Sequence, residues 1–385
     1  MIGLPLAVMI GSCVENFEMP VTGDKVRFLV VDGFLNTGNG NVNVNVLRAS
    51  MISESGSAFE ADATVVLEDP AGNSYLLAEL GSGKYQGSTP AVEAGLQYRL
   101  YIKTEDGKEY RSAFITVKST PEIKEVSWKA LTDGTQITLD TEDATHSTRY
   151  YQWVLEETWE YHSRYSSYCS LAVSPDTIIA IPRSPAEMID VCYRTQPSTR
   201  IFTATTTGLT QDQINDYELV FLPKGTEKLG YLYSILVRQY SISKETYEYL
   251  EKLKKTSQDL GGLYSPQPSN VTGNLYNVAD PSEVVLGYFN AGAATEKRLF
   301  ITLDELPASL RTVKPDPTFC TTGTITANNP DTLQKKLRGF VATKKNLPLE
   351  AIFQDARLYG ITHSTTECVD CRVKGGKTIK PVFWP

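Results

Sequence analysis

Hydrophobic and polar residues alternate with a period of two through the first third of the chain, as they do in half-buried β-strands. Valine and asparagine alternate over residues 41–46, and a similar alternation runs through residues 96–103. Turn residues divide residues 25–119 into about seven such segments, the number typical of an immunoglobulin-like or transthyretin-like β-sandwich. The Cys…Trp…Cys pattern of a true immunoglobulin domain does not occur in this segment.

A second and larger domain is expected over residues 120–385, after the boundary at Thr120-Pro121. Most of it again has the pattern of strands, but two segments have the features of helices. Residues 243–257 begin with a capping serine and contain Glu–Lys pairs four residues apart, and residues 331–345 begin with an aspartate after a proline. We therefore predict a mainly β protein, with an N-terminal sandwich followed by a β-rich domain that carries one or two inserted α-helices.

The most aromatic predicted strand covers residues 150–161. Side chains alternate across a strand, so every second residue of this segment shares one face. Glu157 lies between Leu155 and Trp159 on the apolar face, where an ionised carboxylate needs a cationic partner such as arginine or a metal. This face is either buried core or a ligand platform, whose candidate residues are Trp153, Glu157, Trp159 and Tyr161.

The N-terminus has the features of an export signal. Residues 4–11 are apolar and small and lead into Gly11-Ser12-Cys13, an arrangement that resembles a bacterial lipobox. We predict a signal-peptide remnant over residues 1–12, lipidation of Cys13, and a flexible tether over residues 13–24 that contains two glutamates. No lysine or arginine precedes the apolar run, so we expect the natural signal to begin upstream of Met1.

Composition and charge narrow the possible partners. The net charge is −8 and there is no basic stripe, which disfavours nucleic-acid binding and electrostatic adsorption to anionic lipid. The chain has 21 tyrosines but only 3 histidines, which favours β-structure and amphipathic contact surfaces. We expect no cofactor and no metal.

Five cysteines remain when Cys13 is lipidated, and an oxidising envelope favours disulfides among them. A zinc site at the C-x-x-C of residues 368–371 would need two further ligands, for which Cys320 and His363 are available. A redox motif would need to open a helix, whereas the following residues suggest a turn. We expect structural disulfides, with Cys320 joined to Cys368 or Cys371; the candidates are Cys169, Cys192, Cys320, Cys368 and Cys371.

Motifs for nucleophilic, zinc-hydrolase, Walker or dinucleotide chemistry do not occur in the sequence, so we expect no enzyme activity. The alternative is an envelope hydrolase that uses Glu156, Glu157 or Glu160. On one strand Glu156 and Glu160 would lie roughly 13 Å apart. This exceeds the separation of roughly 5–9.5 Å between glycosidase carboxyls, although carboxylates on separate strands could still pair.

Several segments together resemble a family of Bacteroidota lipoproteins, the domain of unknown function 4249. Besides the Cys13 tether, they are residues 29–33, 150–153, 156–159, 239–243, 273–277, 285–289 and 367–384. The resemblance covers essentially the whole chain after Cys13. It implies an outer-membrane lipoprotein encoded beside a TonB-dependent receptor, and it implies no catalytic residue.

These observations predict a surface-exposed outer-membrane lipoprotein, anchored through Cys13, that serves a TonB-dependent transporter by capturing an unknown ligand or capping the barrel. A purely structural or adhesive β-sandwich protein is the third interpretation. A flat surface without an aromatic pocket would favour it.

Overall fold

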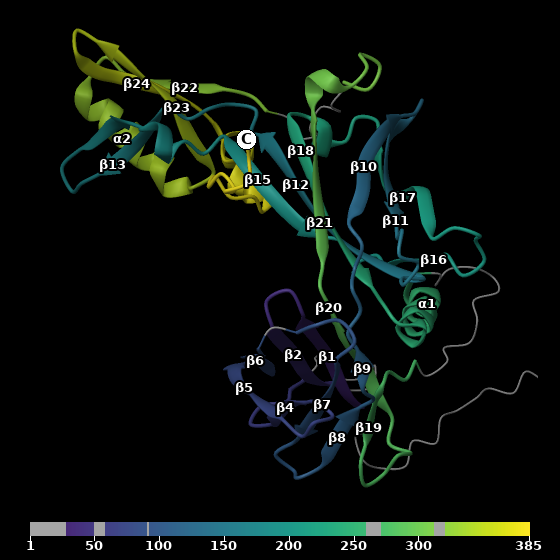
Figure 1. Cartoon of the computed structure of the whole chain (residues 1–385). Coiled ribbons are helices and arrows are strands. Elements are labelled where there is room, and N and C mark those ends of the chain that lie inside the picture. Colours follow the sequence, from purple (N-terminus) through teal and green to yellow (C-terminus); the bar gives the residue numbers. More distant parts are fainter. Residues whose placement is uncertain (1–27, 50–57, 91, 259–270, 312–319) are drawn as a thin grey trace, which may run out of the picture.

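The computed structural model describes residues 28–49, 58–90, 92–258, 271–311 and 320–385. The predicted signal remnant, Cys13 and the tether lie outside these residues. The chain is mainly β, as predicted, and forms a lower and a central β-unit with a third unit beside the central one (Figure 1). Among the described helices, none combines the length and apolarity that crossing a membrane requires.

The lower unit, which we call the first sandwich, is one continuous sheet that curls around a core of valine, leucine and tyrosine side chains. The alternation over residues 41–46 buries each valine and turns each asparagine outward. Its strands are β1 (Phe28–Asn36), β2 (Asn41–Ala49), β3 (Ala58–Phe59), β4 (Thr64–Glu68), β5 (Ser74–Gly81), β6 (Lys84–Ser88), β7 (Gln97–Lys103), β8 (Glu109–Ser112), β9 (Ile115–Thr116), β19 (Leu275–Asn277) and β20 (Val285–Gly292).

Two strands from far along the sequence complete this sheet. β20 pairs in parallel with β1, and β19 pairs with β8 at the opposite end of the strand order. The Asn274 side chain joins the two ends, since it donates to the Phe289 carbonyl at 2.8 Å and accepts from the Phe289 amide at 2.9 Å. The predicted division after residue 119 therefore leaves out two strands that belong to the first sandwich.

Glycine is required where these strands approach closely. A Cβ atom on Gly273 would lie 1.4 Å from the Gly287 carbonyl oxygen, and one on Gly287 would lie 1.9 Å from the Val31 carbonyl oxygen. Gly287 also has a φ of +95°, which an L-residue rarely adopts. The Gly273-Asn274 and Gly287 positions are thus explained by closure of the sheet.

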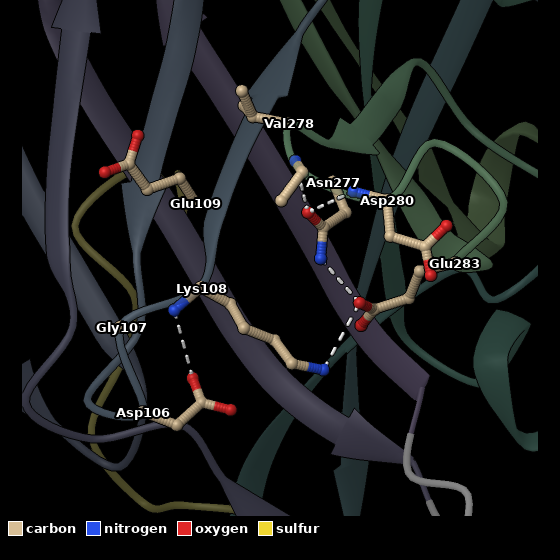
Figure 2. Close-up of a pocket in the computed structure, with 9 residues that line it drawn as sticks. Asp106, Gly107, Lys108, Glu109, Asn277, Val278, Asp280 and Glu283 are labelled. Atoms are coloured by element: carbon tan, nitrogen blue, oxygen red, sulfur yellow. Dashed lines mark hydrogen bonds and ion pairs between the residues drawn. The ribbon is translucent and has the colours of Figure 1, made fainter.

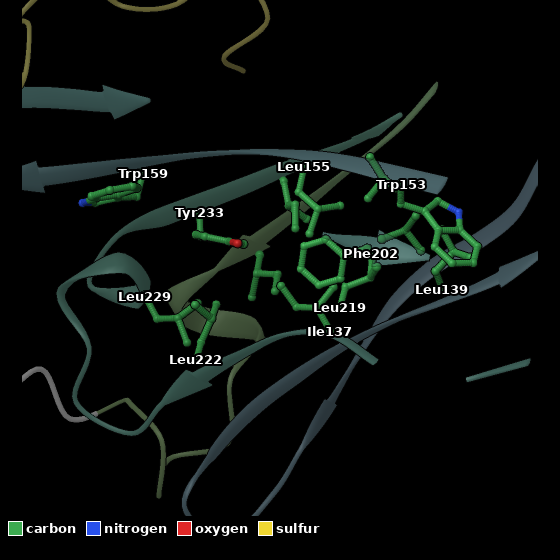
Figure 3. Packing of buried hydrophobic residues seen from close by; sticks show 14 of the residues in the cluster. Ile137, Leu139, Trp153, Leu155, Trp159, Phe202, Leu219, Leu222, Leu229 and Tyr233 are labelled. Atoms are coloured by element: carbon green, nitrogen blue, oxygen red, sulfur yellow. The ribbon is translucent and has the colours of Figure 1, made fainter. Parts of the chain in front are cut away.

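The central unit, which we call the second sandwich, packs a three-stranded sheet against a sheet centred on β12 (Figure 3). Its three-stranded sheet comprises β10 (Ile123–Ala130), β11 (Gly134–Glu142) and β17 (Gln213–Pro223). The opposing sheet comprises β12 (Tyr150–His162), β15 (Val191–Pro197), β16 (Phe202–Thr205), β18 (Leu232–Ser241) and β21 (Thr295–Thr302). Two 3-10 helices accompany them, η2 (Glu227–Leu229) and η3 (Leu303–Glu305), and a third, η1 (Pro185–Glu187), precedes β15 in the sequence.

Helix α1 (Lys244–Gln258) follows β18 directly, in the segment where the sequence indicates a helix. The Ser243 hydroxyl accepts the Thr246 amide at 3.1 Å, which is the N-terminal cap expected from the sequence. The helix packs against the end of the β12 sheet, where Tyr247 contacts Tyr150.

The third unit packs helix α2 against a three-stranded sheet and a hairpin, around a small apolar core of its own. Helix α2 lies within the second segment expected to be helical, apart from its first residue. The elements are β13 (Cys169–Val173), β14 (Ile178–Pro182), β22 (Gly323–Thr326), α2 (Pro330–Thr343), β23 (Asn346–Gln354) and β24 (Arg357–Thr365). The C-terminal tail, residues 366–385, contains α3 (Thr366–Val369) and η4 (Cys371–Lys374) and returns to the second sandwich.

Candidate functional site

The predicted aromatic platform on β12 lies inside the second sandwich. Trp153, Trp159 and Tyr161 are each less than 5% exposed, and Figure 3 shows the two tryptophans at opposite ends of the core cluster. The Trp153 indole donates to Gln239 at 2.9 Å, and Gln239 in turn donates to the Pro121 carbonyl in the linker between the sandwiches. This face of β12 is therefore core and presents no surface to a ligand.

Glu157 has the cationic partner that its position on an apolar face requires. Its carboxylate accepts from the Lys228 ammonium at 2.7 Å and from the Tyr233 hydroxyl at 2.8 Å. Burial and the neighbouring Glu157 raise the pKa of Tyr233 well above its ordinary value. The Lys228 ammonium also lies 5.0 Å from the Trp159 ring centroid. The partner is a lysine from η2, and the ion pair lies at the edge of the core, with Glu157 largely buried and Lys228 partly exposed.

The other two glutamates of β12 bind different partners. Glu156 lies 4.0 Å from Arg238 and from Arg298 on the opposite face of the strand. Glu160 accepts from the Trp384 indole at 3.2 Å and lies 2.8 Å from His162. Each of the three predicted carboxylates thus has its own set of partners.

The cysteines form two disulfides, as expected from their number and the predicted compartment. Cys320 is joined to Cys368, one of the two pairings expected first, and Cys192 is joined to Cys371. Each cysteine of the C-x-x-C motif therefore bonds outside the motif. Cys169, a predicted disulfide candidate, is instead a buried free thiol whose pKa is raised by burial.

Cys192–Cys371 fastens the C-terminal tail to β15 of the second sandwich, and Cys320–Cys368 fastens it to the segment before β22 of the third unit. Near them the Tyr161 hydroxyl donates to the Cys371 carbonyl at 2.8 Å, and Gly376 approaches the same tyrosine so closely that a Cβ would lie 2.2 Å from its hydroxyl. Among the described residues no group of three or more His, Cys, Asp or Glu has the arrangement of a metal site.

A hollow of about 470 Å³ opens at one end of the first sandwich, between the β7–β8 turn and the β19–β20 loop (Figure 2). This volume lies within the range of small-molecule sites. Loops held by a rigid sheet commonly carry binding residues. The lining residues are Asp106, Gly107, Lys108, Glu109, Asn277, Val278, Ala279, Asp280 and Glu283.

Glu283 is the centre of the polar network in this hollow. Its carboxylate accepts from the Tyr110 hydroxyl at 2.8 Å, from the Asn277 amide at 2.6 Å and from the Lys108 ammonium at 3.3 Å. Burial acts to raise the pKa of Glu283, but the three hydrogen bonds outweigh it and lower the pKa. Burial and the hydrogen bond to Glu283 raise the pKa of Tyr110 well above its ordinary value.

The lining offers four carboxylates and one ammonium, which suits reversible binding of a polar ligand. Serine, cysteine and histidine, the usual nucleophiles and bases, do not occur among the lining residues. Sequence reasoning did not find this hollow, because its two loops are separated by roughly 170 residues along the chain. The motif at residues 273–277 was visible in the sequence, but nothing there indicated that it meets the β7–β8 turn.

A second hollow, of about 570 Å³, lies in the third unit between β22 and α2. His363 lines it, and burial lowers the pKa of this histidine. Its Nδ1 atom is buried without a hydrogen-bond partner, and the ring packs 5.1 Å from that of Phe340.

The profile of one protein family, described as "Domain of unknown function (DUF4249)", matches residues 14–298. The chain belongs to the DUF4249 family. The match includes the whole first sandwich. Strands β19 and β20, which complete its sheet from far along the sequence, therefore lie within the family domain. The Gly273-Asn274 contacts give a physical reason for that motif in a DUF4249 protein.

No curated protein matches this DUF4249 chain. The solved structures that are weakly similar to it include the following two. One is a DUF4785 family protein from Legionella pneumophila, at 11% identity and a TM-score of 0.18, with 54% of this chain and 51% of that chain covered. The other is described as manganese lipoxygenase of Gaeumannomyces graminis with a partial zonadhesin of Komagataella pastoris, at 12% identity and a TM-score of 0.17, with coverage of 55% and 88%. This chain spans about half the length of the first, and such low TM-scores carry no argument about function.

Proposed function

We propose that this DUF4249 protein is an exported lipoprotein, anchored through Cys13 to the outer membrane of a Bacteroidota cell, that binds a partner or ligand beside a TonB-dependent transporter. The observation that carries the proposal is the pair of disulfides that hold the C-terminal tail. Disulfides form and persist in oxidising compartments and are rare in the cytosol of ordinary bacteria.

Two further observations support a binding role. The family match begins at residue 14, directly after the predicted lipidated cysteine, as it would if the domain began at a lipid anchor. The polar hollow at the end of the first sandwich is placed on loops, where binding residues concentrate in β-sandwich proteins. The hydrolase alternative gains nothing from β12, because each of its glutamates is already engaged with its own partners.

The test is purification of the full chain, with its natural leader, from gently solubilised membranes of the native cell. We expect the wild-type protein in the outer-membrane fraction together with a β-barrel receptor, identified by mass spectrometry. The Cys13→Ala variant should leave the membrane fraction and lose the barrel. Repeated recovery of the wild-type chain as a lone monomer would contradict the accessory role.

A further inference from the structure

The outer face of the first sandwich carries one unbroken row of side chains across five strands. The strand registers place Tyr276 opposite Arg111, Arg111 opposite Tyr101, Tyr101 opposite Val66, and Val66 opposite Leu76. We call these five residues the Tyr–Arg row. Adjacent strands lie about 4.8 Å apart, so the row extends for roughly 19 Å. It crosses β19, β8, β7, β4 and β5, which are labelled in the lower unit of Figure 1.

The row faces away from the core. The neighbours of its members along each strand, such as Leu77, Leu100 and Tyr110, are buried, so alternation turns the row outward. Leu76 is 69% exposed and Tyr276 is 42% exposed, at the two ends of the row. Large apolar side chains that line up on an exposed face indicate an interaction site more strongly than scattered ones do.

Arg111 in the row is not ion-paired within the described ranges, although Glu109, two residues earlier on the same face of β8, accepts a hydrogen bond from the neighbouring Tyr101. The Nε atom of Arg111 is buried without a hydrogen-bond partner. Its guanidinium lies 5.3 Å from the Tyr101 ring centroid. By contrast, the neighbouring Arg99 on the same face is already paired, with Glu68 at 2.7 Å.

The composition of the row distinguishes between classes of ligand. Sugars stack on aromatic rings, but Val66 and Leu76 give the row an aliphatic half that a glycan would leave unused. Tyrosine and arginine are the residues enriched at the centre of protein interfaces, and paired charges commonly surround them. An unpaired arginine between two tyrosines favours a partner that presents a carboxylate.

We infer that the Tyr–Arg row is the docking surface for a protein partner, which covers Leu76, Val66 and the tyrosines with apolar side chains and places an aspartate or glutamate on Arg111. The inference rests on the proposed function, because it names the surface through which this chain contacts the barrel receptor. It goes beyond the polar hollow, which lies at the loop end of the same sandwich.

The test combines photo-crosslinking and charge reversal in the full chain in native membranes. A photoreactive phenylalanine replaces Tyr101 or Tyr276, and for comparison Ile181 of β14, which is 43% exposed and thus matches Tyr276 in exposure. We expect adducts to the co-purifying barrel from positions 101 and 276 but not from position 181. Arg111→Glu should reduce co-purification at least about tenfold, whereas Arg357→Glu, the same charge change on the third unit, should leave it unchanged.

Folding of the variants is checked by thermal unfolding, and Tyr276→Ala serves as a second variant should Arg111→Glu lower stability. If the wild-type chain brings down the barrel but positions 101 and 276 give no adduct, or if Arg111→Glu and Tyr276→Ala both retain the barrel, the docking surface is wrong and the proposed function stands. Adducts to polysaccharide or to a second copy of this chain would also overturn the inference. If the wild-type chain brings down no barrel, the proposed function fails. The surface would then be supported only by adducts from positions 101 and 276 to one protein identified by mass spectrometry and lost in Arg111→Glu, and overturned without them.

Discussion

Two aromatic faces of β-strands in this chain differ in whether other elements cover them. The face of β12 with Trp153, Trp159 and Tyr161 is covered on one side by a second sheet and at its end by the C-terminal tail. The Tyr–Arg row of the first sandwich is not covered by another sheet: its end residues Leu76 and Tyr276 are exposed and its three middle residues are partly exposed. Alternation thus identifies which side chains share a face, whereas only the packing of other elements decides whether that face becomes core or contact surface.

The largest expected difference between the two faces is in stability. Trp153→Ala removes a buried indole and its hydrogen bond to Gln239, so we expect the free energy of unfolding to fall by about 3–5 kcal/mol. Tyr101→Ala on the open row should change it by less than about 1 kcal/mol. Urea unfolding of both variants in the full chain with Cys13→Ala measures this. Equal losses for the two variants would contradict the assignment of one face to the core.

The second prediction concerns the disulfide that holds the tail over β12. Replacing Cys192 and Cys371 together by alanine should lower the free energy of unfolding by about 2–4 kcal/mol. It should also increase acrylamide quenching of tryptophan fluorescence, because Trp384 and the β12 end are then less protected. Mass spectrometry should show that the Cys320–Cys368 disulfide is still formed in this variant, so that any change comes from loss of the Cys192–Cys371 bond alone. Unchanged quenching would show that the tail stays in place without this bond.

The third and smaller effect concerns the loop that leads into β12. Burial acts to raise the pKa of Asp143, but hydrogen bonds from Thr145, Ser147 and Thr148 outweigh it and hold the pKa well below the ordinary range. A lowered folded-state pKa stabilises the protein above the unfolded-state value of about 3.9 and loses this contribution as the pH falls below it. Asp143→Asn should therefore cost about 1–2 kcal/mol at pH 7.

Unfolding measured between pH 7 and pH 3 tests this prediction. The wild type should lose more stability than Asp143→Asn over that interval, so that the two curves converge in acid. Parallel curves would mean that the carboxylate charge does not support the loop. Asp176→Asn is a suitable control, since this aspartate is exposed and lies in the third unit.

Much of the local structure could be predicted from the sequence. The strand over residues 41–46, the long strand at 150–161 and the helix capped by Ser243 follow from alternation and capping, which act over a few residues. The pairing of Cys320 with Cys368 was one of two expected alternatives. These features depend on neighbours in the sequence or on a small number of possible partners.

The remaining features depend on contacts between distant segments. The parallel pairing of β20 with β1 joins residues roughly 250 positions apart, and no periodicity indicates it. Lys228 as the partner of Glu157, and the tail that covers Tyr161, arise in the same way. The sequence therefore indicated the aromatic strand at 150–161 and left its burial as one of two interpretations. It gave no indication of the Tyr–Arg row, whose members come from five strands.

Hydroxyl-radical footprinting tests most directly the claim that the row, and not the β12 face, is the contact surface. In the purified protein, Tyr101, Tyr276 and Leu76 should be oxidised readily while Trp153 and Tyr161 are protected. In native membranes the row should become protected at least severalfold, and Ile181 should be oxidised at the same rate in both samples. Ready oxidation of Trp153 in the free protein, or an unchanged rate at Tyr276 in membranes, would contradict the account.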